Sequence, residues 1–496
     1  MVYVVEDIRE SLAAILGREN VIDDPAVLAA YERDESFAAA MRPRLVVRPG
    51  SQDEVQRLVA WANASGTPLV PVSSGPPHFH GDTVPGAPGT IIVDLTRLRR
   101  VLRVDRRNRI CVIEPGVTWA ELQPALAEYG MRVTPPLAPR ASKSVVAGLL
   151  ERTPTLIPRY NYHLPEPLRD CGVVWGSGEI MYTGEAGSGP LSLEEQWRSG
   201  VVQAEHKGPA QTDFCRFLTG AQGTMGIVTW ASVKCELLPT AQRSVVVSAP
   251  RLEDVVPFLY QLNRVRLGDE VLVLNGAFLA RLLAASGEGC EDLPAWNVLI
   301  GLGGRRHLAE ERVRVQEADL EVLTAQHGLA PASAVGGVDA GRLADVAAGC
   351  CETPWKLAAK GGTSDIFFLT TLDKAQGYIE MAHDVVTSLG FSASDVGVYI
   401  QPQHQGVSWH VEVSLAYDPG DATASANARR FHDAASERLI AAGAYFSRPY
   451  GSWARPVYDR DAASREALCK VKRIFDPLGV MNPGKLCFAT PARKEA

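Results

Sequence analysis

The sequence lacks the features that mark membrane-spanning, nucleic-acid-binding and secreted proteins. Within its 496 residues, no apolar run approaches the ~18 residues that a membrane-spanning helix needs. Lys and Arg number 50 against 57 Asp and Glu, and the resulting net charge of −7 argues against a general nucleic-acid binder, which would carry a basic surface. The N-terminus has no basic region followed by an apolar stretch, so we expect no signal peptide.

Cysteine is present but follows no metal-binding or redox pattern. The nine cysteines form no Cys-x-x-Cys motif, which argues against a zinc knuckle and against a redox dithiol. An odd number of cysteines in a chain without a signal peptide predicts reduced thiols and a cytoplasmic location. Hydrophobic residues make up 46% of the chain and charged residues 22%, an ordinary globular balance that argues against disorder as the main state.

The pattern of apolar residues changes near residue 244. Before this point, short strands near 45–47, 69–72 and 91–95 alternate with helices, which predicts an α+β arrangement. After it, longer helices alternate with apolar strands, which predicts an α/β layered domain over 244–445. The last segment, 446–496, returns to a loop, a helix and a Gly/Pro turn.

Three loops rich in small residues are candidate ligand-binding elements. Pro71–Gly81 follows a predicted strand, and its small residues would expose backbone N–H groups able to cradle a pyrophosphate. Ala221–Thr229 precedes a strand, and Gly223 and Gly226 would let the chain turn tightly against a ligand. Asp476–Leu486 has the pattern of a helix end followed by a Pro-Gly turn. Taken singly, each loop is also consistent with an ordinary turn.

In their order along the chain, these motifs resemble a known family. The succession is Pro43-Arg-Leu-Val-Val-Arg-Pro49, the Pro/Gly loop, Val93-Asp-Leu95, Glu114-Pro-Gly-Val-Thr118, Gly220–Thr229 and Asn482-Pro-Gly-Lys485. It resembles the flavoproteins of the vanillyl-alcohol oxidase / p-cresol methylhydroxylase superfamily. The resemblance implies a p-cresol methylhydroxylase-type (PCMH-type) FAD-binding domain of two α+β subdomains, over 1–243 with the C-terminal segment 446–496. It also implies an α/β cap domain with an antiparallel sheet over 244–445.

The resemblance further implies FAD as the cofactor. The Pro/Gly loop would hold the pyrophosphate, segments 136–148 and 220–229 would contribute further flavin contacts, and the C-terminal turn would lie near the isoalloxazine. The predicted cofactor-binding residues are Val72, Ser73, Ser74, Gly75, Pro76, Pro77, His78, Pro136, Ser142, Ser144, Gly148, Gly223, Gly226, Ile227, Asn482 and Lys485.

The sequence departs from the family in the loops that would contact FAD. Prolines and a histidine stand at 76–78 where the family has more glycine, and proline offers no N–H donor. Arg140 and Lys143 replace further glycines, and these cations would pair with FAD phosphates, pair with an acidic substrate, or be solvated. Some members attach FAD covalently through a histidine of this loop, which makes His78 and His80 candidates, although their register differs by about one residue.

Two branches of the superfamily share features with this chain. Glu151-Arg152 followed by Pro158–His163 resembles the phenol-oxidising branch, and Arg448 matches its phenolate-binding arginine, but its other phenolate-binding tyrosine and its catalytic aspartate have no clear counterpart. The D-lactate/glycolate dehydrogenase branch binds a divalent metal through two segments. His404–His410 resembles the first, whereas Pro449-Tyr-Gly451 replaces the second. We therefore predict no bound metal and retain a metal-assisted 2-hydroxy-acid dehydrogenase as an alternative.

Four residues near the end of the cap are the predicted substrate site. His410 and Glu412 lie two apart on a probable strand, so their side chains share a face. A neutral imidazole there would accept the hydroxyl proton of a substrate, while Arg448 and Tyr450 would bind an oxyanion or carboxylate. A purely structural hydrogen-bonded pair in the cap is the alternative.

The resemblance implies an FAD-dependent oxidoreductase that removes a hydride from an alcohol or hydroxylated carbon of an aromatic or acidic small molecule. Oxygen or an electron carrier would reoxidise the flavin, and the chain would form a homo- or hetero-oligomer. A catalytically reduced partner subunit of a flavoenzyme complex is a further alternative, because several loop glycines are missing at 76–78 and 139–147.

Overall fold

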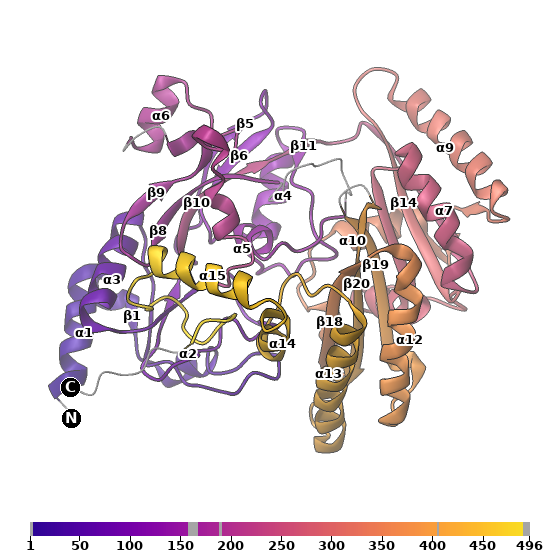
Figure 1. Ribbon diagram of the computed structural model, residues 1–496. Coiled ribbons are helices and arrows are strands. Elements are labelled where there is room, and N and C mark those ends of the chain that lie inside the picture. Colours follow the sequence, from indigo (N-terminus) through magenta and orange to yellow (C-terminus); the bar gives the residue numbers. More distant parts are fainter. Residues whose placement is uncertain (1–2, 157–166, 188–190, 404–405, 490–496) are drawn as a thin grey trace.

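The computed structural model describes residues 3–156, 167–187, 191–403 and 406–489. Two smaller sheets with their helices form one half of the molecule, and a seven-stranded antiparallel sheet with its helices forms the other (Figure 1). This arrangement confirms the predicted α+β class, with an antiparallel sheet in the second half. The described residues include no helix long and apolar enough to cross a membrane.

The first sheet has the strand order β1-β2-β4-β3. Its strands are β1 (Val21–Ile22), β2 (Leu45–Val47), β3 (Leu69–Val72) and β4 (Ile91–Asp94). The pairs β2–β4 and β3–β4 are parallel; a helix connects β2 to β3, and the Pro/Gly loop connects β3 to β4. Its helices are α1 (Tyr3–Leu16), α2 (Pro25–Ala29) and α3 (Gln52–Ser65), and α3 packs buried aliphatic side chains against the sheet. The carboxyl end of β3 leads directly into the Pro/Gly loop.

The second sheet is antiparallel, in the order β5-β6-β10-β8-β9. Its strands are β5 (Val101–Asp105), β6 (Ile110–Ile113), β8 (Leu168–Trp175), β9 (Ile180–Tyr182) and β10 (Gly226–Lys234). The associated elements are α4 (Trp119–Ala127), α5 (Val145–Leu150), α6 (Leu193–Ser199) and the short pair β7 (Met131–Arg132) with β11 (Glu236–Leu237). The glycine-containing turn before β10 therefore lies at one end of a central strand.

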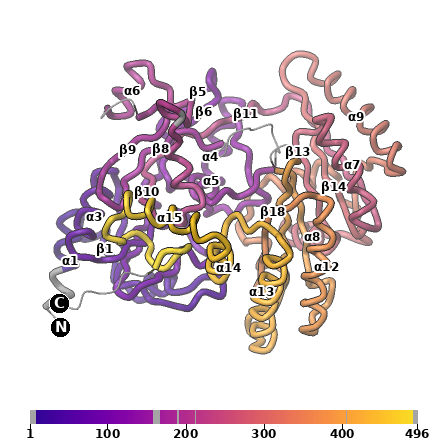
Figure 2. The backbone as a smooth tube through the Cα atoms, in the orientation of Figure 1, coloured from indigo at the N-terminus to yellow at the C-terminus, as the bar shows by residue number. Residues whose placement is uncertain are grey.

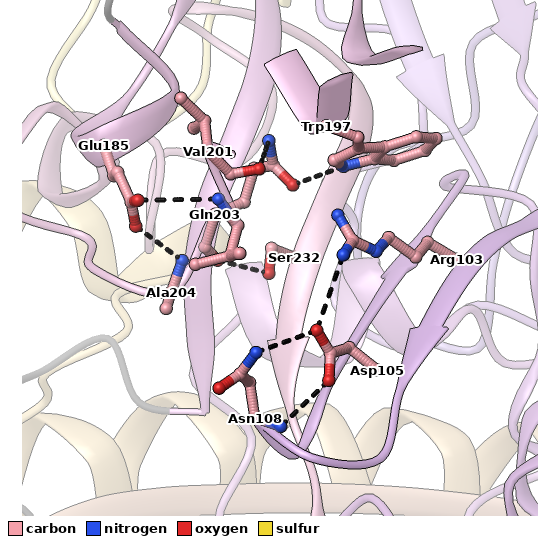
Figure 3. Close-up of polar contacts among 10 residues, drawn as sticks. Arg103, Asp105, Asn108, Glu185, Trp197, Val201, Gln203, Ala204 and Ser232 are labelled. Carbon is pink, nitrogen blue, oxygen red and sulfur yellow. Dashed lines mark hydrogen bonds and ion pairs between the residues drawn. The ribbon is translucent and has the colours of Figure 1, made fainter. Parts of the chain in front are cut away.

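A polar network fixes the segment after α6 to this second sheet (Figure 3). The side chain of Gln203 is fully buried; its Oε1 accepts from Trp197 Nε1 at 2.7 Å and its Nε2 donates to Gln196 Oε1 at 3.0 Å. Its carbonyl accepts from Ser232 Oγ at 2.7 Å. The next amide, Ala204, donates to the carboxylate of Glu185 at 3.0 Å. Every polar atom of the Gln203 side chain thus has a partner.

The third sheet contains the strands of the predicted cap, in the order β15-β12-β14-β13-β19-β20-β18. They are β12 (Ala241–Ala249), β13 (Glu270–Asn275), β14 (Trp296–Gly304), β15 (Pro331–Ala332), β18 (Gly362–Thr370), β19 (Val396–Gln403) and β20 (Ser408–Tyr417); β16 (Ala334–Val335) and β17 (Val338–Asp339) form a separate hairpin. One face packs against α7 (Leu252–Val265), α9 (Ala309–Gln326), α12 (Leu372–Ser388) and α13 (Ala422–Ala442) (Figure 1). The other face packs in part against α8 (Gly276–Ala285), α10 (Ala340–Ala348) and α11 (Trp355–Ala358).

After the cap, the chain returns to the first half of the molecule. Helix α15 (Ala462–Phe475) lies against the second sheet of the first half, and the short helix α14 (Ala454–Tyr458) lies between α13 and α15 (Figure 2). Beyond α15, the Leu69 amide donates to the Val480 carbonyl and the Asn482 amide donates to the Leu69 carbonyl, both at 2.8 Å. The C-terminal turn is thereby fixed beside β3. The domain limits at 243 and 445 stay a prediction, and the cap sheet itself begins at Ala241.

Candidate functional site

A cavity of about 1040 Å³ lies between the loop after β3 and the turn before β10. We call it the loop cavity. Of the predicted cofactor residues, those on its wall are Val72, Ser73, Ser74, His78, Gly223, Gly226 and Ile227. Arg140, Lys143, His80 and Gln222 also line it, as do Asp82 and Glu151, for which no flavin contact was predicted.

Other predicted cofactor residues do not line the loop cavity. The Gly75 amide donates to the Ser142 carbonyl at 3.0 Å, and the Gly75 carbonyl accepts from Arg140 Nη2 at 2.9 Å. Ser142 Oγ contacts the Pro76 carbonyl at 3.2 Å, so the centre of the Pro/Gly loop is bound to segment 140–142. Pro76 and Pro77 are joined by a cis peptide bond and also lie off the cavity wall.

Further predicted residues act as supports for the cavity. Ser144 caps α5 by accepting from the Ala147 amide, and its own amide donates to Ser74 Oγ at 3.1 Å. Asn482 is buried and its Nδ2 donates to the carbonyls of Asp82 and Gln222 at 2.9 and 2.7 Å, which joins the two loops. Lys485 donates to the Gly81 carbonyl at 2.7 Å.

The residues of the loop cavity fit FAD. Hydroxyl groups of Ser73 and Ser74 and the cations Arg140 and Lys143 are donors suited to a pyrophosphate. The wall also has apolar side chains, including Leu95, Val146, Leu150, Ile227 and Val228, which suit a planar ring system.

A second cavity, the junction cavity, continues from the first into the cap. It has a volume of about 850 Å³ and shares His80, Arg140, Lys143 and Glu151 with the loop cavity. Its further wall includes Pro136 and Gly148 from the predicted cofactor set and, from the cap and the segment after it, Lys356, Phe367, Tyr399, Glu412 and Arg448. The junction cavity therefore joins the cofactor region to the cap sheet.

A half-buried ion pair lies where these two cavities meet. Lys143 Nζ lies 2.5 Å from Glu151 Oε1. Burial lowers the pKa of Lys143, although Glu151 opposes this. Burial alone would raise the pKa of Glu151, but Lys143 outweighs it and the net shift is downward. Burial and the nearby Glu151 raise the pKa of Asp82 to about 7. The Lys143–Glu151 pair is thus ionised within the cavity wall.

His410 and Glu412 lie on the same face of β20, as the alternation of a strand predicts. Both are buried, and His410 Nε2 lies 3.6 Å from Glu412 Oε2, too far for a hydrogen bond. Burial lowers the pKa of His410 to about 4, although Glu412 opposes the shift. The imidazole is therefore neutral at pH 7, and its Nε2 has no hydrogen-bond partner in the described residues.

Glu412 is held by a lysine from α11. Lys356 Nζ lies 2.6 Å from both Glu412 Oε1 and Asp365 Oδ2. Asp365 Oδ1 in turn accepts from Thr363 and Ser414 at 2.6 and 2.7 Å. Burial alone would raise the pKa of Glu412, but Lys356 and His410 hold it well below its usual range. Glu412 is therefore a fixed negative charge and a poor base.

Arg448 and Tyr450 follow α13 and contact the same sheet edge. The Arg448 guanidinium carbon lies 4.2 Å from the centroid of the Phe367 ring, a cation–π contact. Tyr450 stacks on His80 with centroids 4.5 Å apart, and burial raises the pKa of Tyr450 well above its usual value. Burial also lowers the pKa of His80 to about 3, so this stack is uncharged.

The four predicted substrate-site residues are thus gathered at the junction of the two halves, but they do not open to one cavity. Glu412 and Arg448 line the junction cavity, whereas Tyr450 lines the loop cavity. A third cavity of about 1480 Å³, which we call the outer cavity, is lined by His410 and again by Arg448. Lys356, Glu151 and Arg152 were absent from the predicted site set and lie in the walls of these cavities.

Two sequence features cannot be placed. Residues 158–163 and His404 lie outside the described part of the chain. Within the described residues, no group of three or more His, Cys, Asp and Glu side chains could hold a metal ion.

Comparisons with known proteins bear on the cofactor-binding domain and on the fold. Residues 43–153 match the family described as an FAD binding domain. D-lactate dehydrogenase [cytochrome] 1 of Saccharomyces cerevisiae mitochondria is 24% identical over 61% of this chain and 49% of that protein. The chain thus aligns with about half the length of this curated relative.

Two solved structures share the whole fold. The 4-ethylphenol oxidase of Gulosibacter chungangensis matches with a TM-score of 0.80 at 19% identity, covering 98% of each chain. A p-cresol methylhydroxylase matches with a TM-score of 0.82 at 18% identity, covering 98% of this chain and 97% of the other. At this identity the likeness establishes the fold.

Proposed function

We propose that this chain, which has the PCMH-type flavoprotein fold with an FAD-binding domain at 43–153, is an FAD-dependent oxidoreductase acting on an alcohol or hydroxylated carbon. The observation that carries the proposal is the placement of a neutral, unpartnered His410 in a cavity wall beside Arg448, which also lines the junction cavity. The junction cavity shares its wall with the loop cavity that fits FAD.

His410 is the proposed base. Its pKa of about 4 leaves the imidazole neutral at pH 7, and its Nε2 has no other partner in the described residues. When bound, FAD supplies the acceptor for the hydride that leaves the substrate carbon. His410 Nε2 takes the proton from the hydroxyl on the same carbon, so that the hydroxyl becomes a carbonyl.

Glu412 and Lys356 set the electrostatics of that proton transfer. The ionised Glu412 lies 3.6 Å from His410 Nε2 and stabilises the imidazolium that forms. Lys356 keeps Glu412 ionised and prevents it from competing for the proton. Arg448 has a cation–π contact to Phe367 and no ion pair within the described residues, and it is left to bind an oxyanion of the substrate.

The cofactor contacts follow from the walls of the loop cavity. Ser73, Ser74 and the loop backbone, with Arg140 and Lys143, would hold the pyrophosphate. Gly223, Gly226 and Ile227 would lie against the flavin, and Asn482 and Lys485 would hold the loops that enclose it. His78 and His80 are the candidates for covalent attachment, which denaturation followed by a test for released flavin would decide.

An acidic substrate is favoured over a simple phenol. The relatives named D-lactate dehydrogenase [cytochrome] and D-2-hydroxyglutarate dehydrogenase act on hydroxy acids by their names, and each is about a quarter identical to part of this chain. A D-2-hydroxy-acid dehydrogenase is therefore the second candidate function. A loss of activity after chelation and its return with a divalent metal would distinguish the metal-assisted form. The acceptor for either function is oxygen or an electron carrier.

Anaerobic reduction of the bound flavin tests the proposed function. The purified FAD-loaded protein is mixed without oxygen with a panel of alcohols, hydroxy acids and para-substituted phenols. Bleaching of the oxidised flavin absorbance by at least one hydroxylated compound is expected. A protein that binds FAD but is bleached by none would instead indicate a partner subunit that has lost catalysis, and a stable complex with another chain would support that outcome.

A further inference from the structure

We infer that Arg152 and Arg448 together form the binding site for a carboxylate group of the substrate, with Arg152 as a specificity-determining residue. This inference rests on the proposed function, because it assigns the substrate class of the same site. The two guanidinium groups both line the outer cavity, and His410 lies in the same wall.

The position of Arg152 is fixed by the segment that carries Arg448. Its Nη2 donates to the carbonyl of Ser447, the residue that precedes Arg448. Gly220 packs closely against this guanidinium. A side chain at that position would crowd it, because a Cβ there would lie 3.0 Å from Arg152 Nη2. The arginine is therefore held beside Arg448 by contacts from two separate segments.

The charges around Arg152 and Arg448 are unbalanced. Neither has a carboxylate within ion-pair distance in the described residues, and Arg152 Nε is buried without a hydrogen-bond partner. Burial lowers the pKa of Arg152, and the positive charge of Arg448 lowers it further. The neighbouring lysines Lys143 and Lys356 are half-buried, and each has an acidic partner. Two neighbouring positive charges without a counter-ion are unfavourable away from solvent. A bound anion would reduce both their mutual repulsion and their desolvation cost.

The backbone of Arg152 is also held in an uncommon conformation. Its φ is +55°, in the left-handed region that few residues other than glycine adopt. Arg152 is the left-handed C′ residue of the Schellman motif that ends α5: the Arg152 amide donates to the Leu149 carbonyl and the Thr153 amide donates to the Gly148 carbonyl, both at 3.0 Å. Because the helix ends here, Glu151 lines the junction cavity and the next residue, Arg152, lines the outer cavity.

A carboxylate fits this pair better than a phenolate does. A carboxylate has two oxygens that can accept several N–H donors at once, whereas a phenolate offers a single oxygen. Because His410 lines the same cavity, the carboxylate would lie on the same side of the substrate as the hydroxyl to be oxidised. The substrate class is therefore a hydroxy acid.

Calorimetry on the FAD-loaded protein tests the pair without turnover. The probes are oxalate and benzoate, their neutral counterparts oxamide and benzamide, and an unreactive phenolate. The wild-type protein should bind the carboxylates at least about tenfold more tightly than the amides. Equal affinity for acid and amide, or tighter binding of the phenolate, overturns the inference whatever the variants show.

The variants then assign the preference to Arg152. Arg152→Met should weaken carboxylate binding by about tenfold or more and leave amide binding unchanged, and Arg152→Lys should restore part of it. The matched control is Arg264→Met, which removes an exposed arginine from α7 away from the three cavities. Carboxylate affinity within twofold of wild type in Arg152→Met overturns the assignment.

Flavin reduction separates this inference from the proposed function. A hydroxy acid that reduces wild type and Arg152→Met with the same KM would overturn the arginine pair and leave the oxidoreductase intact. If no hydroxylated compound reduces the flavin, the proposed function fails, and the calorimetry still decides whether the pair binds carboxylates.

Discussion

Two regions of this molecule bury polar side chains, and they differ in whether those side chains have partners. Around Gln203 on the second sheet, both polar atoms of the side chain and the backbone carbonyl are hydrogen-bonded (Figure 3). At the junction with the cap, Arg152 Nε, His410 Nε2 and Gln401 Oε1 are buried without partners in the described residues.

The difference separates a structural network from a binding site. A buried polar group left unpaired costs about 1–3 kcal/mol, so a fully paired network stabilises the fold by itself. Unpaired groups gathered at one set of cavities keep their donors and acceptors available for a ligand. Lys356 falls between the two cases, because it lies in the junction wall and yet has two carboxylate partners.

The largest expected effect is on proton transfer. His410→Gln removes the proposed base but keeps a polar side chain of similar reach, and it should slow anaerobic flavin reduction by about 10²–10⁴-fold. Stopped-flow absorbance of the FAD-loaded protein measures this rate. An unchanged rate would mean that the unpaired Nε2 has no part in the reaction.

Removal of the Arg448 guanidinium, which lines the junction cavity and the outer cavity, should have the next largest effect. Arg448→Met should raise the KM for an acidic substrate by about 10–100-fold, because it removes a charge-assisted hydrogen-bond donor. Steady-state kinetics with a hydroxy acid provide the measurement. Catalysis like that of wild type would remove Arg448 from the substrate site.

Lys356 lies in the wall of the junction cavity but is paired with two carboxylates, so its replacement tests whether such a paired residue has a structural role. Lys356→Met leaves two buried carboxylates, Asp365 and Glu412, without their counter-ion, and the free energy of unfolding should fall by about 3–5 kcal/mol. Chemical denaturation followed by circular dichroism reports this loss. The pKa of Glu412 should rise in the variant, so reduction at low pH should slow more than in wild type. Wild-type stability would contradict the structural role of this network.

A smaller loss of stability is expected in the paired region. Gln203→Ala breaks the bonds to Trp197 and Gln196 and should reduce the free energy of unfolding by about 1–3 kcal/mol. Flavin reduction by this variant should match wild type once the protein is folded. A large change in reduction rate would contradict a purely structural role for the Gln203 network.

The smallest expected effect concerns pH. With a pKa of about 4, His410 is neutral above that value and becomes protonated only as pH falls through it. The base form is therefore present across neutral pH, and the reduction rate should vary less than about twofold between pH ~5 and ~8. An ordinary imidazole, with a pKa near 6.5, would lose activity by about thirtyfold at the acid end. A profile of that second kind would show that burial does not depress the pKa of His410.

Much of this architecture was predictable because it depends on local sequence patterns. The loop residues Ser73 and Ser74, the turn at Gly223 and Gly226, and the shared face of His410 and Glu412 each follow from a few adjacent residues. The predicted fold class is confirmed for the same reason, since strand and helix periodicity change visibly along the chain.

The contacts between distant segments were not predictable. Lys356 lies on a four-residue helix and meets Glu412, 56 positions later, only because β18 and β20 pair in the sheet. Gly75 turns toward Ser142 rather than the cavity because two loops pack together. The left-handed backbone of Arg152 has no local signal such as glycine.

The central claim is that the unpartnered groups at the junction bind an acid and that FAD accepts the hydride. One anaerobic titration tests it most directly: the FAD-loaded protein is titrated with a 2-hydroxy acid and, in parallel, with the corresponding neutral amide. We predict that the acid bleaches the oxidised flavin at concentrations at which the amide has no effect. Equal bleaching by acid and amide, or bleaching by neither, would contradict the account.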